Sequence, residues 1–168
     1  MADLPQIMDA NLPMSIDSQT VFPLLSLIVL LPIVGALIMP FLPTQESKNS
    51  NLPRNIALVI LLADFLIIVL AFANLFDPSS ESLQLVERLQ WLPSIGLEWS
   101  LGVDGISAPL VVLSGLITFL SAAASWKVKQ KTRLYFALLL IQASAQALVF
   151  LSQDFLLFFL AWELELVP

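Results

Sequence analysis

Three carboxylates inside long apolar stretches are the side chains of this chain best suited to chemistry. Asp64 lies in the stretch 56–76, and Glu163 and Glu165 lie in the stretch that starts at residue 155. An ionised carboxylate at the middle of a membrane helix costs roughly 3 kcal/mol. Because a carboxylate buried without a cation can bind and release a proton near neutral pH, residues of this kind are candidates for a proton relay.

Glu163 and Glu165 cannot act as a carboxylate pair, because side chains two residues apart on a helix point about 200° from each other. Each one therefore needs its own partner. The residue pattern alone fits two roles for Glu163 equally well, proton transfer and a structural hydrogen bond between helices. Glu165 is a second candidate for proton transfer, with a position against another helix, a neighbouring subunit or the membrane interface as the alternative. For Asp64 we expect a structural hydrogen bond in helix packing, with a place in a polar path as the alternative.

Three polar residues, Gln142, Ser144 and Gln146, alternate with alanines in the apolar stretch 134–151. Residues four apart share one face of a helix, so Gln142 and Gln146 form a polar stripe beside a stripe of alanines that permits close packing. We expect this helix to lie inside a bundle and these three residues to serve helix packing. A hydrated polar path beside the last apolar stretch is the alternative.

The 168 residues are 58% hydrophobic and 12% charged, and the mean hydropathy is +0.91. Charged residues at about half the usual quarter of a globular chain cannot supply a soluble surface, which predicts a bilayer protein. The chain has no Cys and no His, so it offers no thiolate, haem, iron–sulfur or usual zinc ligands. We therefore expect no cofactor in this chain. Its net charge of −6 argues against a nucleic-acid partner.

Four apolar stretches are long enough to cross a bilayer, since roughly 20 helical residues span a hydrocarbon core of roughly 30 Å. They are 22–42, 56–76, 106–126 and 134–151. A fifth stretch, 155–168, is only about 21 Å long as a helix. We expect it to be an unfinished span of a longer protein, with a short buried or re-entrant helix as the alternative. The predicted fold is an all-α polytopic membrane protein, with a polar tail at 1–20 and one membrane domain at 21–168.

Residues 77–105 are predicted to form a small β-hairpin between the second and third membrane helices. Residues 97–103 alternate apolar and polar side chains, which suits a half-buried strand, and residues 82–91 alternate less regularly. Pro93 and Gly96 mark the turn between the two strands. An irregular loop on the membrane interface is the alternative.

Six of the seven Lys and Arg residues fall in two segments, between the first and second helices and between the third and fourth. They are Lys48, Arg54, Lys127, Lys129, Lys131 and Arg133. Basic residues in short loops are retained on the cytoplasmic side. The sequence therefore predicts that the N-terminus and the hairpin lie on the outer or lumenal face.

Three segments closely resemble one family of membrane subunits. They are SLGVDGISAPLVVL at 100–113, AASWKVKQKTRLYF at 123–136 and QDFLLFFLAWELELVP at 153–168. The family is NdhD, chain 4 of the NAD(P)H-quinone oxidoreductases of cyanobacteria and chloroplasts, which is related to the antiporter-like subunits of respiratory complex I. The resemblance is clear over 100–168 and looser over the first two helices, and the WELELVP run is its most specific element.

The resemblance implies a proton-translocating subunit of a photosynthetic complex I. Glu163 matches the family's proton-transfer carboxylate, which faces a lysine on a later helix that these 168 residues do not include, and Glu165 is typical of the NdhD branch. The resemblance also implies a multi-pass position in the thylakoid membrane among other membrane subunits of the complex. Iron–sulfur clusters and plastoquinone would then lie on partner subunits, and this chain would couple their electron transfer to proton pumping.

Two other functions fit the same residues. A subunit of an Mrp-type Na⁺/H⁺ antiporter belongs to the same superfamily and would assemble with other antiporter subunits. A membrane scaffold fragment without pumping activity would tolerate the replacement of both Glu163 and Glu165 by leucine.

Overall fold

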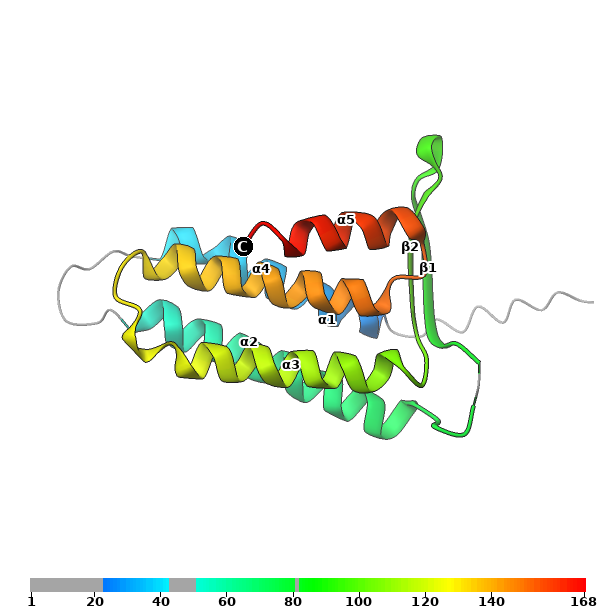
Figure 1. The fold of residues 1–168 in the computed structure, drawn as a ribbon, viewed down its shortest axis with the longest axis horizontal. Helices are drawn as coiled ribbons and strands as arrows, with labels where there is room; N and C mark the ends of the chain where they lie inside the picture. The colour runs from blue at the N-terminus through cyan, green and yellow to red at the C-terminus, as the bar shows by residue number, and fades with distance from the viewer. Residues whose placement is uncertain (1–22, 43–50, 81) are drawn as a thin grey trace, which may run out of the picture.

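The computed structural model describes residues 23–42, 51–80 and 82–168, which form five α-helices and one two-stranded antiparallel sheet (Figure 1). The helices are α1 (Leu24–Ile38), α2 (Leu52–Leu75), α3 (Ser107–Ala124), α4 (Thr132–Leu151) and α5 (Phe155–Glu165). The strands are β1 (Gln84–Leu92) and β2 (Leu97–Val103), and the short 3₁₀ turns are η1 (Met39–Phe41), η2 (Pro93–Ile95) and η3 (Ser125–Lys127). The predicted polar tail at 1–20 lies outside the described residues.

Four helical stretches are long and apolar enough to cross a membrane, as the sequence predicts. They are Leu24–Phe41, Leu52–Leu75, Ser107–Lys127 and Thr132–Leu151. The second begins at Leu52 and not at residue 56, because Pro53 occupies the first turn, where a missing N–H breaks no helical hydrogen bond. The fifth helix, α5, has 11 residues and is about 16 Å long.

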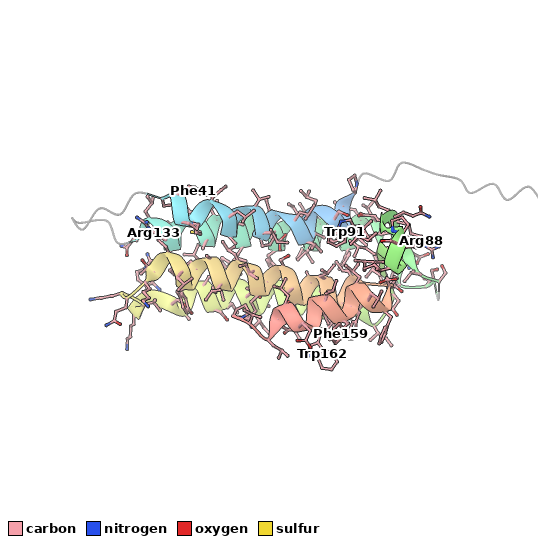
Figure 2. All side chains as sticks on the ribbon, turned by 90° about the horizontal axis from the view of Figure 1, so that it is seen from above. Phe41, Arg88, Trp91, Arg133, Phe159 and Trp162 are labelled. Carbon is pink, nitrogen blue, oxygen red and sulfur yellow. The ribbon has the colours of Figure 1, made fainter. Side chains whose placement is uncertain are left out.

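Successive helices run in opposite directions and pack as a bundle, and α5 runs beside α4 and ends partway along it (Figure 1). The hairpin stands across one end of this bundle. The basic segment between α3 and α4 lies at the other end, so that Arg133 is far from Arg88 and Trp91 of the hairpin (Figure 2). The described basic residues, except Arg88, therefore gather at the end away from the hairpin.

Two apolar clusters form the core, one toward each end of the bundle. The hairpin-end cluster consists of Leu25, Ile28, Val29, Ile68, Ala71, Phe72, Leu97, Leu101, Val103, Ala108, Val111, Ala147, Leu148, Leu151, Leu157 and Ala161. The basic-end cluster consists of Ala36, Met39, Ala57, Leu61, Ala122, Phe136, Ala137, Leu140 and Ala143. Each of the helices α1 to α4 contributes to both clusters, so one face of each helix is packed along most of its length.

The predicted β-hairpin between α2 and α3 is present. Its strands pair antiparallel, with Glu87 opposite Leu101 and Leu89 opposite Trp99. Gly96 closes the turn with a φ of 71°, in the left-handed region that favours glycine. β2 is largely buried and β1 is largely exposed, so β2 is the strand that joins the core.

One carboxylate of the hairpin holds the start of α1. The Glu87 side chain accepts hydrogen bonds from the backbone N–H groups of Leu25 at 2.6 Å and Ser26 at 2.9 Å, and from the Ser26 hydroxyl at 2.5 Å. The Trp99 indole N–H donates to the same hydroxyl oxygen at 2.8 Å. The first N–H groups of a helix have no partner within the helix, and negative charge is favourable at that end. Glu87 therefore caps α1 from a strand distant in sequence.

The other edge of the hairpin is joined to the turn between α4 and α5. The Gln153 backbone N–H donates to the Ser100 carbonyl at 2.8 Å, and Leu101 forms an antiparallel bridge with Ser152. The hairpin thus positions the start of α5 as well as the start of α1.

The chain enters α3 through Asp104. Its Oδ1 accepts hydrogen bonds from the backbone N–H groups of Ile106 at 3.0 Å and Ser107 at 2.7 Å, and its own N–H donates to the Ser107 hydroxyl at 2.9 Å. The hydrogen bonds with Ser107 hold the pKa of Asp104 below its ordinary value. Such a carboxylate stabilises the fold at pH values above its ordinary pKa. This stabilisation is lost as the pH falls through the lower pKa of the folded state.

Replacement of Glu87 by alanine leaves the first N–H groups of α1 without their acceptor. We expect Glu87→Ala to lower the free energy of unfolding by about 2 kcal/mol, measured by thermal unfolding in detergent. Glu98→Ala is the matched control, since Glu98 is exposed on the same hairpin and forms no side-chain hydrogen bond with a described residue. Equal losses in the two variants would contradict the capping role.

The Asp104→Asn variant removes the charge at the start of α3 and keeps an acceptor. As the pH falls from about 5 to about 2, the variant should lose less stability than the unaltered protein, because its side chain does not titrate there. Thermal unfolding at several pH values measures the difference. Equal losses of stability in the two proteins would show that the titration of Asp104 does not contribute to unfolding at low pH.

Candidate functional site

Three buried polar side chains form a layer between the two apolar clusters. Asp64 of α2, Thr118 of α3 and Ser144 of α4 are each at most 5% exposed. Along its own helix, each lies between the residues given to the basic-end cluster and the residues given to the hairpin-end cluster. The layer therefore lies at mid-depth of the bundle, where a bilayer is hydrocarbon.

Asp64 is the carboxylate at this depth. It lies on the packed face of α2, between the buried residues Leu61 and Ile68. Its Oδ1 is buried and has no hydrogen-bond partner among the described residues. The structural hydrogen bond expected from the sequence therefore has no donor for this oxygen in residues 23–42, 51–80 and 82–168. An unpaired buried polar atom costs about 1–3 kcal/mol, so helix packing alone does not account for Asp64.

The α4 residues Ser144 and Gln142 have different surroundings. Ser144 donates to the Val29 carbonyl of α1 at 2.5 Å, in the turn before Pro32. Pro32 has no N–H to donate to the Ile28 carbonyl, so Ser144 binds α1 one residue after the carbonyl at which the helical hydrogen bonds are interrupted. Gln142 is half-buried and forms no hydrogen bond with a described residue. Ser144 therefore ties α4 to α1, whereas Gln142 does not join a described network.

Gln146 links three helices through hydrogen bonds. Its Oε1 accepts from the Ser114 hydroxyl at 3.1 Å and lies 3.5 Å from the Thr118 hydroxyl, and its Nε2 donates to Oε1 of Glu165 at 3.2 Å. Thr118 gives its single hydroxyl proton to the Ser114 carbonyl at 2.8 Å, so the Ser114 hydroxyl is the donor that orients the Gln146 amide. We name Ser114, Thr118, Gln146 and Glu165 the polar chain.

The rotation of α5 determines which of its two glutamates joins the polar chain. Leu157 and Ala161 are the buried residues of α5 and mark its packed face. Glu165 is about 40° around the helix from Ala161 and is half-buried, whereas Glu163 is about 200° from Ala161 and exposed. None of the described residues covers the Glu163 side of α5, so the predicted proton-transfer role of Glu163 stays a prediction.

The side of α5 that carries Glu163 is otherwise apolar. Phe155, Phe159, Trp162 and Leu166 recur there at spacings of three and four and are 47–79% exposed. Phe159 and Trp162 project from α5 away from the other helices (Figure 2). In a membrane, such a side faces lipid or another protein segment.

A recess of about 150 Å³ adjoins the polar chain. Ser114 and Gln146 line it together with Leu110, Leu113, Ile117 and Phe150. A larger pocket of about 790 Å³ lies between α1, α5 and the hairpin. Its lining includes Arg88, and its other polar residues, Ser26 and Glu87, are already bound in the cap of α1. The smaller recess is therefore the one that adjoins polar groups on α3 and α4.

Sequence reasoning missed the two hydroxyl residues of the polar chain, Ser114 and Thr118. They lie four residues apart on α3, which is the same spacing that identified Gln142 and Gln146 on α4. The described residues contain no group of three or more His, Cys, Asp or Glu side chains that could hold a metal. The candidate site is thus a set of carboxylates, amides and hydroxyls suited to holding and exchanging protons.

Curated proteins provide relatives, although no family model matches the chain. The chain is 49% identical over 147 residues to an NAD(P)H-quinone oxidoreductase chain 4 of Microcystis aeruginosa, which covers 88% of this chain and 26% of the relative. It is 53% identical over 151 residues to the NAD(P)H-quinone oxidoreductase chain 4 of Prochlorococcus marinus strain NATL1A, which covers 89% of this chain and 28% of the relative. The chain therefore spans about a quarter of the length of these relatives.

Solved structures share the fold. A chain of respiratory complex I from Thermus thermophilus with bound NADH is similar with a TM-score of 0.69 and 25% identity, over 86% of this chain and 27% of that chain. A chain of the membrane-bound sulfane sulfur reductase, an archaeal respiratory membrane complex, shows the same fold with a TM-score of 0.68 and 22% identity, over 85% of this chain and 28% of that chain. These comparisons confirm the resemblance found in the sequence: the chain belongs to the NAD(P)H-quinone oxidoreductase chain 4 (NdhD) family of multi-pass membrane subunits.

Proposed function

We propose that the chain is part of a proton-translocating membrane subunit of an NAD(P)H-quinone oxidoreductase of the photosynthetic complex I type. The observation that carries this proposal is the 49–53% identity to cyanobacterial chain 4 proteins over 88–89% of the chain. The similar chain from Thermus thermophilus belongs to a respiratory complex I, which supports the same assignment.

The chain's part in this enzyme is proton movement and not electron transfer. Its residues include no Cys and no His, the usual ligands of iron–sulfur clusters and haem. The iron–sulfur clusters and plastoquinone therefore belong to partner subunits. The chain couples the electron transfer of those partners to the movement of protons.

Glu163 is the proposed proton-transfer residue. It lies about 12 Å along α5 from Phe155, on the open side between Phe159 and Leu166. The matched relatives are about four times as long as the chain, so a full-length subunit has further residues that can cover this side. A cationic group brought to Glu163 there would let the carboxylate exchange protons as the pair opens and closes.

The proposed location is the thylakoid membrane, with the basic end of the bundle toward the cytoplasm or stroma and the hairpin toward the lumen. The segregation of the described basic residues to the end away from the hairpin supports this orientation. The partners are the lipid bilayer and the other membrane subunits of the complex.

Two competing functions lead to different expectations. The identity to chain 4 proteins favours the quinone oxidoreductase over an Mrp-type Na⁺/H⁺ antiporter subunit. Substitution of Glu163 distinguishes a pumping subunit from a membrane scaffold, because only the pumping subunit should lose activity.

Glu163→Gln in the full-length subunit should lower proton pumping at least about tenfold while the complex still assembles, because glutamine keeps the shape but carries no exchangeable carboxyl proton. Acidification of thylakoid vesicles during electron transfer to quinone measures pumping, and native gel electrophoresis measures assembly. Glu98→Gln on the exposed hairpin is the control for loss of a charge. Normal pumping by an assembled Glu163→Gln complex would favour the scaffold.

Asp64 is the second proposed member of a polar path, since its buried Oδ1 costs stability without a described partner. Asp64→Leu should therefore raise the free energy of unfolding by about 1–3 kcal/mol and lower proton pumping. Thermal unfolding and vesicle acidification of the same complex measure both effects. A gain in stability with normal pumping would remove Asp64 from the path, and a loss of stability would reveal a structural hydrogen bond.

A further inference from the structure

Glu165 is the glutamate of α5 that the chain itself holds in place. It is half-buried at the end of α5, about 15 Å along the helix from Phe155. Its Oε1 accepts a hydrogen bond from the Gln146 amide, and no described donor reaches its Oε2. A carboxylate held by one oxygen keeps the other oxygen available to bind a proton.

From this geometry we infer that Glu165 is a second proton-carrying residue and that Gln146 positions it. The inference rests on the proposed proton-translocating function. In the step, Oε2 of the Glu165 carboxylate binds a proton from the translocation path, and the new O–H bond neutralises the carboxylate. The same proton then leaves for the next acceptor and restores the charge, so the step needs no electron transfer and no other reactant.

Gln146 acts as a positioning residue, because an amide N–H donor stabilises the charged carboxylate without giving up its proton. Its orientation is set from α3, where the Ser114 hydroxyl donates to Oε1 of Gln146. With Oε1 turned toward Ser114, Nε2 faces Glu165. If the Gln146 amide were turned by 180°, its oxygen would face the Glu165 carboxylate. No hydrogen bond could then form, because both groups are acceptors.

The recess beside the polar chain leaves room for a water molecule that takes the place of the Ser114 hydroxyl. Its volume of about 150 Å³ exceeds the roughly 30 Å³ of one water molecule, and Ser114 and Gln146 are the polar residues of its otherwise apolar lining. A water molecule there can replace the Ser114 hydroxyl as donor to Gln146. Glu165 does not line this recess, so the Gln146 amide is not replaced in the same way.

No charged group competes with Gln146 for Glu165 among the described residues. The elements that make the most contacts with α5 are α4 and β2. Their charged or titratable side chains are Arg133 and Tyr135 of α4 and Glu98 of β2, and none of these is hydrogen-bonded to Glu165. The Gln146 amide is therefore the described group that contacts the Glu165 carboxylate.

The experiment compares variants of the full-length subunit in the assembled complex. Gln146→Met keeps the side-chain length and removes the N–H donor. We expect it to shift the pH profile of proton pumping toward higher pH by about one unit, which is a tenfold change in proton affinity, because the carboxylate then binds a proton more readily. Gln142→Met is the matched control, since Gln142 lies one turn earlier on α4 and has no described hydrogen bond. It should leave the profile unchanged.

Two further variants keep the inference testable if Gln146→Met fails to assemble. Ser114→Ala should shift the profile in the same direction by a smaller amount. Glu165→Gln should lower pumping several-fold with assembly intact, and Glu165→Asp should restore part of it.

Identical profiles for Gln146→Met and Gln142→Met, or normal pumping by Glu165→Gln, would overturn the inference. Glu163→Gln in the same series separates that outcome from a failure of the proposed function. Pumping lost in Glu163→Gln and kept in Glu165→Gln removes only the inference, whereas pumping kept in both variants removes both.

Discussion

Hydrocarbon offers no hydrogen bonds, so each polar group inside a membrane bundle must find its partner within the protein. The contacts that join these elements follow from this constraint. Glu87 supplies the acceptor for the first N–H groups of α1, and Ser144 binds the α1 backbone beside Pro32. Gln146 joins hydroxyls of α3 to a carboxylate of α5. The polar contacts thus connect helices that apolar packing alone would leave free to slide or rotate.

Asp64 is an exception to this constraint at mid-depth of the described bundle, since its buried Oδ1 has no partner among the described residues. Apolar residues before and after it on α2 pack into the two clusters, so the helix is well held without it. A buried carboxylate oxygen without a described donor lowers stability, and a leucine would fill the same place at less cost. A cost of this kind inside a membrane bundle is expected where the group has a function.

The two glutamates of α5 show how a helix can present similar side chains to two different environments. One side of α5 packs on α4 and β2 and brings Glu165 to Gln146, while the other side carries Glu163 among exposed aromatic residues. In a full-length subunit these environments correspond to the interior of this bundle and to whatever covers the open side. The proposed proton-transfer residue Glu163 and the inferred second one, Glu165, therefore lie at nearly the same depth of α5, about 200° apart.

The sequence by itself determined the spans, the hairpin and the family. Each depends on local features: the length of apolar runs, the alternation of residues 97–103 with a turn at Gly96, and the WELELVP run. Helical periodicity also determined that Glu163 and Glu165 diverge, because an angle between two residues of one helix needs no other helix. It did not determine which of them faces the bundle. The rotation of α5 is decided by long-range contacts, such as Gln153 with Ser100 at the start of α5, and by the packing of Ala161 in the core. Tertiary structure alone could therefore place Glu165 half-buried beside Gln146, leave Glu163 exposed and bring Ser114 to Gln146. Periodicity sets relative angles within a helix, and only packing sets its rotation against its neighbours.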